Sequence, residues 1–227
     1  MLLQRRRPPV VFGGPSLREV RRLYPYSFDY RPPVRRGDLH ELLAERSASR
    51  GCVLITDGVF GESLSVSPIE CIDMLEAGWI LMGSSSMGAL RAADCCRVGM
   101  IGVGDIFFSY RTGYFHSDAD VAVLYDQKAQ RELSVSLAHA DHLIRVLTVR
   151  RTFSDIVRRL ILKDLRAIPW YERNPLLAGE ILARRVGDPQ IKGEFLALWE
   201  DVGHNPKVRD AVSACNLLSK YFLKNIA

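Results

Sequence analysis

The chain has 227 residues, of which 48% are hydrophobic and 25% are charged, and its formal net charge is +5. This length and composition allow a substantial buried core, and the mean hydropathy near zero excludes a disordered tail and an integral membrane protein. No apolar run in the sequence approaches the roughly 20 residues that span a bilayer. The positive charge favours an acidic protein partner or an anionic ligand, and we expect neither a membrane nor a nucleic acid as partner.

The cysteines indicate the compartment in which the chain works. Their number is odd, no two have the Cys-x-x-Cys spacing, and they are Cys52, Cys71, Cys95, Cys96 and Cys215. This pattern indicates neither a disulfide framework nor a zinc knuckle. We therefore expect reduced thiols, a cytoplasmic location and no metal site.

The first strand is predicted at residues 10–12, a short run that ends at the turn Gly13-Gly14-Pro15-Ser16. Helical spacing follows over 16–24, and a polar, proline-rich link covers 30–36. Asp38 and Glu41 have the spacing of a capping box, in which Asp38 accepts a backbone amide and Glu41 reaches back, so the next helix is predicted to open there.

The second strand is predicted at 52–56, a continuous apolar run typical of a strand that is buried on both faces. It ends at Asp57-Gly58. Ser67 and Glu70 form a second predicted capping box, with a proline at the first helical position. A third strand at 79–82 leads through the turn at 83–88 into a helix that runs to about residue 98.

Three strands joined by helical crossovers predict an α/β fold, with a Rossmann-like parallel sheet covered by helices on both faces. From residue 127 onward the strand signals disappear and helical periodicity dominates. We therefore predict an α/β core at residues 1–125 and an α-helical C-terminal extension, or small helical domain, at 126–227. In such sheets ligands bind beyond the carboxyl ends of the strands. The three loops that follow the predicted strands are rich in glycine, serine and carboxylate.

The third of these loops carries the strongest chemical signal. Ser86 has small residues two positions before and after it, Ser84 and Gly88, at a strand-to-helix turn, which is the spacing of a nucleophile elbow. The amides of the following helix are placed to stabilise an oxyanion or to hold a carboxylate or phosphate. The competing interpretation is structural, because serines often cap helices and small residues permit close packing of helix on sheet. Both interpretations remain open.

A serine nucleophile needs a base. His116 is the most suitable histidine, with Asp120 or Asp118 to orient it, and a solvated loop histidine is the alternative. Asp57 ends a buried strand, where it is placed to orient a water, bind a cation or accept a hydrogen bond from a substrate. Its alternative is a turn-forming Asp-Gly pair.

Arg91 lies five residues after Ser86, which corresponds to roughly 500° of helix rotation, so the two do not share a face. We expect Arg91 to pair with a nearby carboxylate such as Glu70 or Asp57. The Gly-x-Gly at 102–104 follows a helix rather than a strand, and the chain has no Walker A sequence. No nucleotide, dinucleotide or other cofactor is therefore expected.

Five segments, in this order, resemble the TfuA-like core domain family. They are VFGGPSL at 11–17, RGD at 36–38, DGVF at 57–60, SSMGALRAA at 85–93 and GMIGVG at 99–104. The resemblance covers residues 10–125, and its most specific part is the stretch that begins at Ser86. The family's acidic segment corresponds to 118–123, where Asp120 replaces a more usual glutamate and an alanine stands in place of an acidic residue.

The resemblance implies partnership with a YcaO-type enzyme, which uses ATP to activate a peptide amide oxygen for replacement. It implies a role in thioamidation and in the modification of ribosomally synthesised peptides of the trifolitoxin type. Two hypotheses follow. In the first, the chain is a hydrolase-like enzyme that releases sulfide from a thiocarboxylated carrier protein. In the second, it is a non-catalytic adaptor that binds the YcaO enzyme or its precursor peptide.

The sulfide-releasing hypothesis assigns roles to individual residues. Ser86 serves as nucleophile or binding hydroxyl, Asp57 positions a water, and Arg91 holds the structure or an anionic group. The candidate catalytic residues are Ser86, Asp57, Arg91, His116 and Asp120. The candidate substrate- or anion-binding residues are Gly13, Gly14, Ser16, Asp38, Ser84, Ser85 and Gly88.

Overall fold

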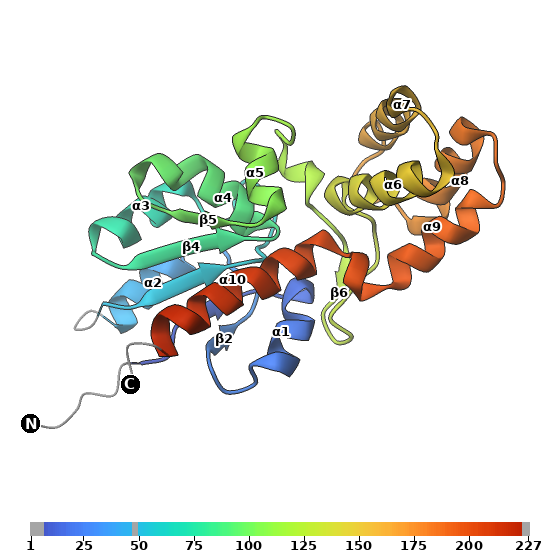
Figure 1. Ribbon diagram of the computed structural model, residues 1–227. Helices are drawn as coiled ribbons and strands as arrows, with labels where there is room; N and C mark the ends of the chain where they lie inside the picture. Colours follow the sequence, from blue (N-terminus) through green and yellow to red (C-terminus); the bar gives the residue numbers. More distant parts are fainter. Residues whose placement is uncertain (1–6, 47–49, 224–227) are drawn as a thin grey trace, which may run out of the picture.

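The computed structural model describes residues 7–46 and 50–223, and its centre is a five-stranded parallel sheet in the order β2-β1-β3-β4-β5 (Figure 1). The strands are β1 (Val10–Phe12), β2 (Asp29–Arg31), β3 (Cys52–Ile55), β4 (Ile80–Ser84) and β5 (Ile101–Val103). Every neighbouring pair is parallel, and Val11 of β1 lies opposite Tyr30 of β2 and Leu54 of β3. This arrangement confirms the predicted Rossmann-like α/β core.

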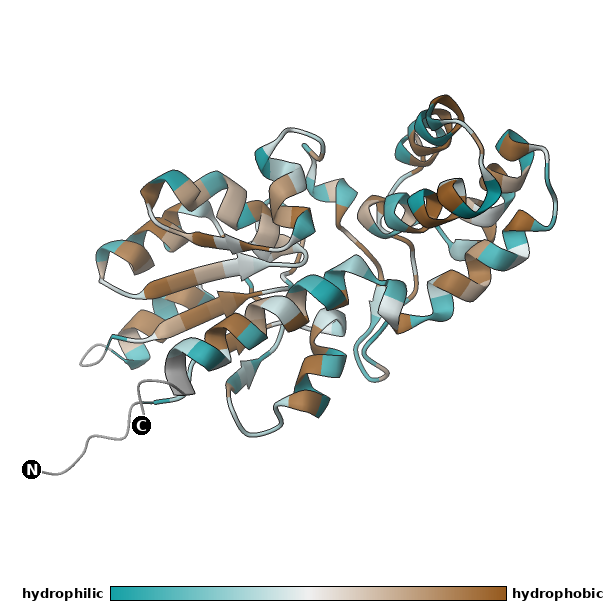
Figure 2. Ribbon diagram, in the orientation of Figure 1, coloured by the Kyte–Doolittle hydropathy of each residue, from teal (hydrophilic) through white to brown (hydrophobic). Residues whose placement is uncertain are grey.

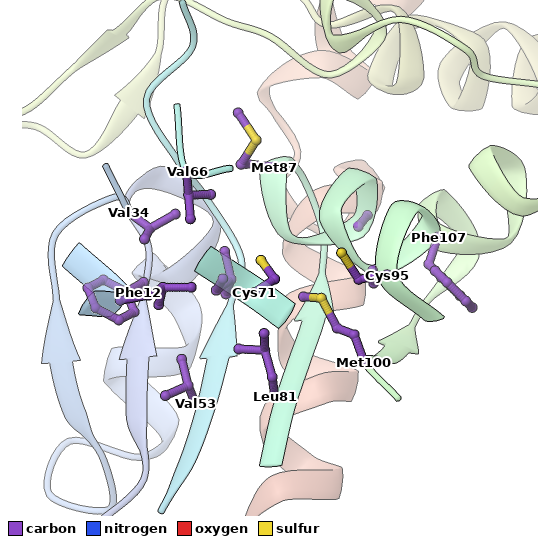
Figure 3. Packing of buried hydrophobic residues seen from close by; sticks show 14 of the residues in the cluster. Phe12, Val34, Val53, Val66, Cys71, Leu81, Met87, Cys95, Met100 and Phe107 are labelled. Carbon is purple, nitrogen blue, oxygen red and sulfur yellow. The ribbon is translucent and has the colours of Figure 1, made fainter. Parts of the chain in front are cut away.

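One face of the sheet is covered by helices α2 to α5. These helices are α2 (Asp38–Glu45), α3 (Pro68–Glu76), α4 (Met87–Cys95) and α5 (Asp105–Arg111). Alternate strand residues point toward them, so that Phe12, Val53 and Leu81 pack in one cluster with Cys71 and Met87 (Figure 3). The period of two in a strand explains this alternation.

The opposite face is covered from both ends of the chain. Helix α1 (Arg18–Leu23) and helix α10 (Pro206–Leu223) lie there, and α10 runs back along the sheet from the far side of the molecule (Figure 1). The intervening strand residues Val11 and Leu54 pack with Ala211 and Leu218 of α10. The last helix therefore completes the core of the α/β part.

A second hydrophobic cluster lies between four helices. They are α6 (Leu137–Arg151), α7 (Asp155–Arg166), α8 (Pro175–Val186) and α9 (Ile191–Glu200). Leu143, Leu165, Leu182 and Phe195 are among its buried members. Figure 2 shows hydrophobic residues in the central strands and on one side of these helices, with hydrophilic residues outward.

Short elements join the two parts. A two-stranded antiparallel ribbon, β6 (Tyr125–Asp126) with β7 (Arg131–Glu132), comes between the sheet and α6. Four 3₁₀ turns complete the description: η1 (Pro15–Leu17), η2 (Cys96–Val98), η3 (Asp118–Asp120) and η4 (Val202–His204). Among the described residues, the helices are too short or too polar to cross a membrane.

The local predictions have mixed outcomes. The capping box at Ser67 and Glu70 is confirmed in both directions, and Pro68 is the first residue of α3. The capping box at Asp38 is wrong, because Gly37 is the N-cap and the Asp38 carboxylate accepts the Arg35 amide at 2.7 Å. Gly37 has a φ of +94°, which glycine adopts without steric cost, so a left-handed residue rather than a side chain begins this helix.

Candidate functional site

The strand order places the candidate site. From β1 the chain passes to β2 on one side, and β3 then joins β1 on its other side, so the strand order reverses between β1 and β3. Ligands of open parallel sheets bind beyond the carboxyl ends of the strands at such a reversal. The loop that follows β1 contains Gly14 and Ser16, and Asp57 follows β3, so both loops meet there.

The Asp57 carboxylate ties these loops together. Its Oδ2 accepts the Gly14 amide at 2.8 Å and the Ser16 amide at 3.1 Å, and its Oδ1 accepts the Ser16 hydroxyl at 2.6 Å. The Ser16 oxygen in turn accepts the Ser85 hydroxyl at 2.8 Å. This chain of hydrogen bonds joins residues from the exits of β1, β3 and β4, so the predicted convergence of the three loops is present.

Burial shifts the pKa of this carboxyl group. Asp57 is 6% exposed. Burial raises the pKa of the Asp57 carboxyl above its ordinary value, and the Ser16 hydroxyl, the Lys207 ammonium and the Gly14 amide offset this only in part. A carboxyl with a raised pKa at the end of a buried strand is suited to accept or give a proton.

The turn from β4 to α4 is strained at Ser85, one residue before the predicted nucleophile Ser86, whose own φ is −120°. Ser85 has a φ of +68°, an uncommon value for a residue with a side chain. Ser86 is the N-cap of α4, but its side chain makes no capping hydrogen bond and lies 3.4 Å from the Val121 carbonyl oxygen. The capping interpretation of the Ser86 hydroxyl is therefore wrong, since that group is held only by a long hydrogen bond.

The glycine after the turn allows close packing. A Cβ on Gly88 would lie 1.8 Å from the Ile55 carbonyl oxygen, so the start of α4 rests directly on β3. This contact has a consequence for anion binding. The amides of Ser86 and Gly88 both donate to the Thr56 carbonyl, at 3.0 and 3.2 Å. These two amides are thus already bonded and do not form the oxyanion site expected from the sequence.

A pocket of about 290 Å³ opens beside Asp57 and Ser86. Arg35 and Phe60 line it from the α/β part, and Tyr125 of β6 and Trp170, from the segment between α7 and α8, line it from the other side. The volume is near the lower limit of small-ligand sites, so the pocket suits a slender group. Burial also raises the pKa of the Tyr125 phenol, so this hydroxyl stays protonated at neutral pH.

His116 and Asp120 lie elsewhere. His116 lines a larger pocket, of about 590 Å³, between the segment after α5 and helix α7. Asp120 is buried and accepts the amides of His116 and Ser117 at 3.0 and 3.1 Å, and Arg166 lies 3.4 Å from it. The structure therefore brings Asp57 and Ser86 together in one pocket and places His116 in another.

Arg91 has structural partners. Its guanidinium donates to the Val66 carbonyl at 2.7 Å and to Asp94 at 2.7 Å, which fixes α4 against the segment before α3. Arg91 therefore pairs with a nearby carboxylate as expected, but this carboxylate is Asp94, one helical turn away on the same face, rather than Glu70 or Asp57. Glu70 instead accepts the Gly37 amide at 2.7 Å in addition to its capping bonds.

The remaining candidate residues support the turns. The Ser84 hydroxyl donates to the Val103 carbonyl at 2.8 Å and so joins β4 to β5. A Cβ on Gly13 would lie 2.1 Å from the Thr56 hydroxyl oxygen, and one on Gly14 would lie 3.0 Å from Pro33. The Asp38 carboxylate accepts the Arg35 amide within its own turn. Of the predicted binding residues, Gly14, Ser16 and Ser85 are those that join the Asp57 network.

Most residues that line the pocket were not predicted from the sequence, and Arg35, Tyr125 and Trp170 are the ones with a side chain suited to bind a ligand. Arg35 lies in the proline-rich link, Tyr125 in the ribbon and Trp170 between two helices of the C-terminal half. An exposed arginine beside the RGD segment and a lone tryptophan after a proline are weak signals. Arg35 and Trp170 are recognisable as pocket residues only in the folded chain, where they line the same pocket.

The sequence was compared with known families and curated proteins. The model of the family described as TfuA-like protein matches residues 57–174, just over half of the chain. The chain belongs to the TfuA-like family. The match begins later than the resemblance seen in the sequence and continues beyond residue 125 through α6 and α7, so the interpretation that the resemblance ends there is wrong. No curated protein matches the sequence.

Membership gives a general functional setting. TfuA-like proteins are associated with YcaO-type systems of thioamide and peptide modification. The matched segment contains Asp57, Ser86, Tyr125 and Trp170, which are four of the pocket residues. The pocket therefore lies largely within the part of the chain that defines the family.

Proposed function

We propose that this TfuA-like protein releases sulfide from a thiocarboxylated small carrier protein for a YcaO-type enzyme that thioamidates a peptide in the cytoplasm. Water converts the carrier thiocarboxylate into a carboxylate and hydrogen sulfide, so the C–S bond breaks, a C–O bond forms and no oxidant or reductant is needed. The observation that carries the proposal is the placement of the Asp57 carboxylate and the Ser86 hydroxyl in one narrow pocket.

Asp57 is the proposed proton acceptor. Its raised pKa and its position at the reversal of strand order suit a group that takes a proton from an attacking water or from the Ser86 hydroxyl. The amides of Gly14 and Ser16 and the Ser16 hydroxyl hold the carboxylate in place. Ser86 is proposed as the nucleophile or as the hydroxyl that binds the thiocarboxylate.

The charge of the chain suits the proposed substrate. A thiocarboxylate is an anion, and Arg35 places an exposed guanidinium at the pocket. The formal net charge of +5 favours encounter with an acidic carrier protein. The pocket is too small for a folded domain, so we propose that only the extended end of the carrier enters it.

The second candidate function is that of a non-catalytic adaptor that recruits or activates the YcaO enzyme. It is supported by the amides of Ser86 and Gly88, which are bonded to Thr56, and by the position of His116 in a different pocket. Both observations reduce the number of groups in the pocket that could catalyse hydrolysis. In this case the helices of residues 126–227 would carry the binding surface, and Ser86 would be dispensable.

Sulfide release from a thiocarboxylated carrier separates the two functions. We expect Ser86→Ala to lower release by about 10²-fold or more while binding to the YcaO enzyme is unchanged. The matched control is Ser109→Ala, which removes a serine hydroxyl that bonds the Asp105 carbonyl within α5, outside the pocket. Unchanged circular dichroism of both variants shows that the fold is retained.

The adaptor function predicts a different result. If the wild type releases no sulfide but still increases product when free sulfide is supplied to the YcaO enzyme, the hydrolytic proposal fails. Equal product from the wild type and Ser86→Ala would also contradict it.

A further inference from the structure

Another pocket, of about 100 Å³, lies beside η1. Pro15 of η1 lines both pockets. The walls of this pocket come from η1, α1, β7, α6, α9, η4 and α10. The polar residues that matter are Arg18, Arg131, Glu132, His139, Trp199 and Asn205. Its volume is several times what one water requires, yet it admits only a small molecule or ion.

Two polar groups at this pocket have no hydrogen-bond partner within residues 7–46 and 50–223. His139 is 2% exposed, and neither nitrogen of its ring has a hydrogen-bond partner among the described residues. Its Nδ1 lies 3.8 Å from Glu132, which is too long for a hydrogen bond. The indole nitrogen of Trp199 is also shielded from solvent and has no partner within the described part of the chain. Buried polar groups normally find partners, so both call for an occupant of the pocket.

The chemistry of these two groups defines what the occupant must offer. An indole N–H only donates, so its partner must be an acceptor. A neutral imidazole donates from one nitrogen, and its side-chain χ2 torsion is soft enough for a modest rotation to turn a nitrogen toward the pocket. The occupant is therefore chiefly a hydrogen-bond acceptor.

The charged residues around the pocket indicate the sign of the charge on the occupant. Lys207 is buried and binds one oxygen of Glu132 at 2.9 Å, while Asn205 donates to the other oxygen at 3.3 Å. Glu132 is thus already neutralised by its own partners. Arg18 and Arg131 are exposed beside the pocket, and with Lys207 they make three cations against the carboxylates of Glu132 and Glu200. The excess is positive.

We propose that this pocket binds a small monovalent anion between the Trp199 indole, the His139 imidazole and the two arginines. Its volume excludes nucleotides and peptides. A spherical anion such as hydrosulfide and a planar one such as formate share the chemistry that these donors recognise. Hydrosulfide is the anion that the proposed function produces, and only this choice of ion rests on that proposal.

Anion binding is measured without carrier protein or turnover, so its outcome is independent of the proposed function. Sodium bromide is the probe, titrated at constant ionic strength, and the readout is the NMR signal of the Trp199 indole N–H. The three tryptophans of the chain give three such signals, and Trp199→Phe identifies the one that matters. We expect a saturable shift of that signal alone.

Matched variants test the assignment. Arg18→Gln is expected to weaken bromide binding roughly two- to fivefold, whereas Arg97→Gln, which removes an exposed arginine of η2 outside the pocket, leaves it unchanged. Trp199→Phe keeps an aromatic ring but loses the donor, and it should weaken binding about tenfold or more. That variant lacks the indole signal, so its binding of bromide is followed by the ⁸¹Br line width instead.

Parallel titrations with hydrosulfide and formate show whether the pocket prefers a spherical anion or a small carboxylate. Saturation by hydrosulfide and bromide but not by formate assigns a spherical anion, and saturation by formate alone assigns a small carboxylate. If none of the three ions shifts the Trp199 signal, or if Arg97→Gln weakens binding as much as Arg18→Gln, the pocket holds only water and the proposal is overturned.

Discussion

Replacement of Asp57 by asparagine tests the centre of the candidate site without disturbing its shape. The carboxylate accepts three hydrogen bonds and donates none. With its oxygen in the position of Oδ2, an asparagine keeps the bonds from the amides of Gly14 and Ser16. Its NH₂ group then occupies the position of Oδ1 and donates to the Ser16 oxygen. The Ser16 hydroxyl must turn and donate to the Ser85 oxygen, so the direction of the hydrogen-bond chain reverses.

The magnitude follows from this count of hydrogen bonds. Asp57→Asn retains all three contacts and removes a buried charge, so its free energy of unfolding at pH 7 should be within about 1 kcal/mol of the wild type or higher. Asp57→Ala leaves two amides and one hydroxyl without their acceptor and should cost about 3 kcal/mol or more. The two variants therefore differ in stability although both lack the carboxylate.

Activity, unlike stability, should not distinguish the two variants. Both variants lose the proton acceptor, so sulfide release should fall by about 10²-fold or more in each. Since burial raises the pKa of the Asp57 carboxyl, release by the wild type should increase as the pH rises through that raised pKa. The same group makes folding less favourable as it ionises, because its pKa is higher in the folded than in the unfolded chain. This dependence of stability on pH should be absent in Asp57→Asn.

The measurements are urea unfolding of the three proteins and sulfide release at several pH values. An Asp57→Asn protein that releases sulfide at the wild-type rate would refute the role of the carboxylate as proton acceptor. A loss of about 3 kcal/mol in that variant would refute the argument that the amide can reproduce its hydrogen bonds.

Three further predictions concern stability. Burial by itself raises the pKa of Glu132, but its interactions, above all with the Lys207 ammonium, bring it down to about 2. The ionised Glu132 therefore contributes about 3 kcal/mol to the free energy of unfolding above about pH 5, and this contribution is lost toward pH 2. The difference in unfolding free energy between the wild type and Glu132→Gln should therefore shrink over that range, and a constant difference would contradict the ion pair. Gly88→Ala should cost about 3 kcal/mol or prevent folding, because the new Cβ meets the backbone of β3; thermal unfolding within a few degrees of the wild type would contradict this. Phe195→Ala should cost about 3–5 kcal/mol from its fully buried position between the C-terminal helices, measured by urea unfolding, and a cost below about 1 kcal/mol would show that this cluster is loosely packed.

The sequence by itself determined the elements whose signals are local. Strands β1, β3 and β4 were predictable because continuous apolar or β-branched runs are required of strands that are buried on both faces. The N-terminus of α3 was predictable because both partners of its capping box lie within one turn. Asp57 and Ser86 were found for the same reason, since each follows directly from a strand that the pattern identifies.

The edge strands gave no such signal. Strand β2 consists of Asp29, Tyr30 and Arg31, all partly exposed, and it is held by pairing with β1 rather than by burial of its own side chains. Strand β5 is only three residues long and has Gly102 at its centre, where a Cβ would meet Phe107. Strands whose side chains are not buried on both faces lack the continuous apolar run from which the central strands were predicted.

Tertiary structure alone decided the contacts between distant parts of the chain. The Ser16 hydroxyl bonds Asp57 and Ser85, which are 41 and 69 residues away, and no local pattern specifies such a pairing. In the same way, Trp170 reaches the pocket because the C-terminal helices fold back beside the sheet, and Ala211 completes the core through α10. Periodicity shows which face of an element is buried, but the partner that buries it is chosen by the packing of the whole chain.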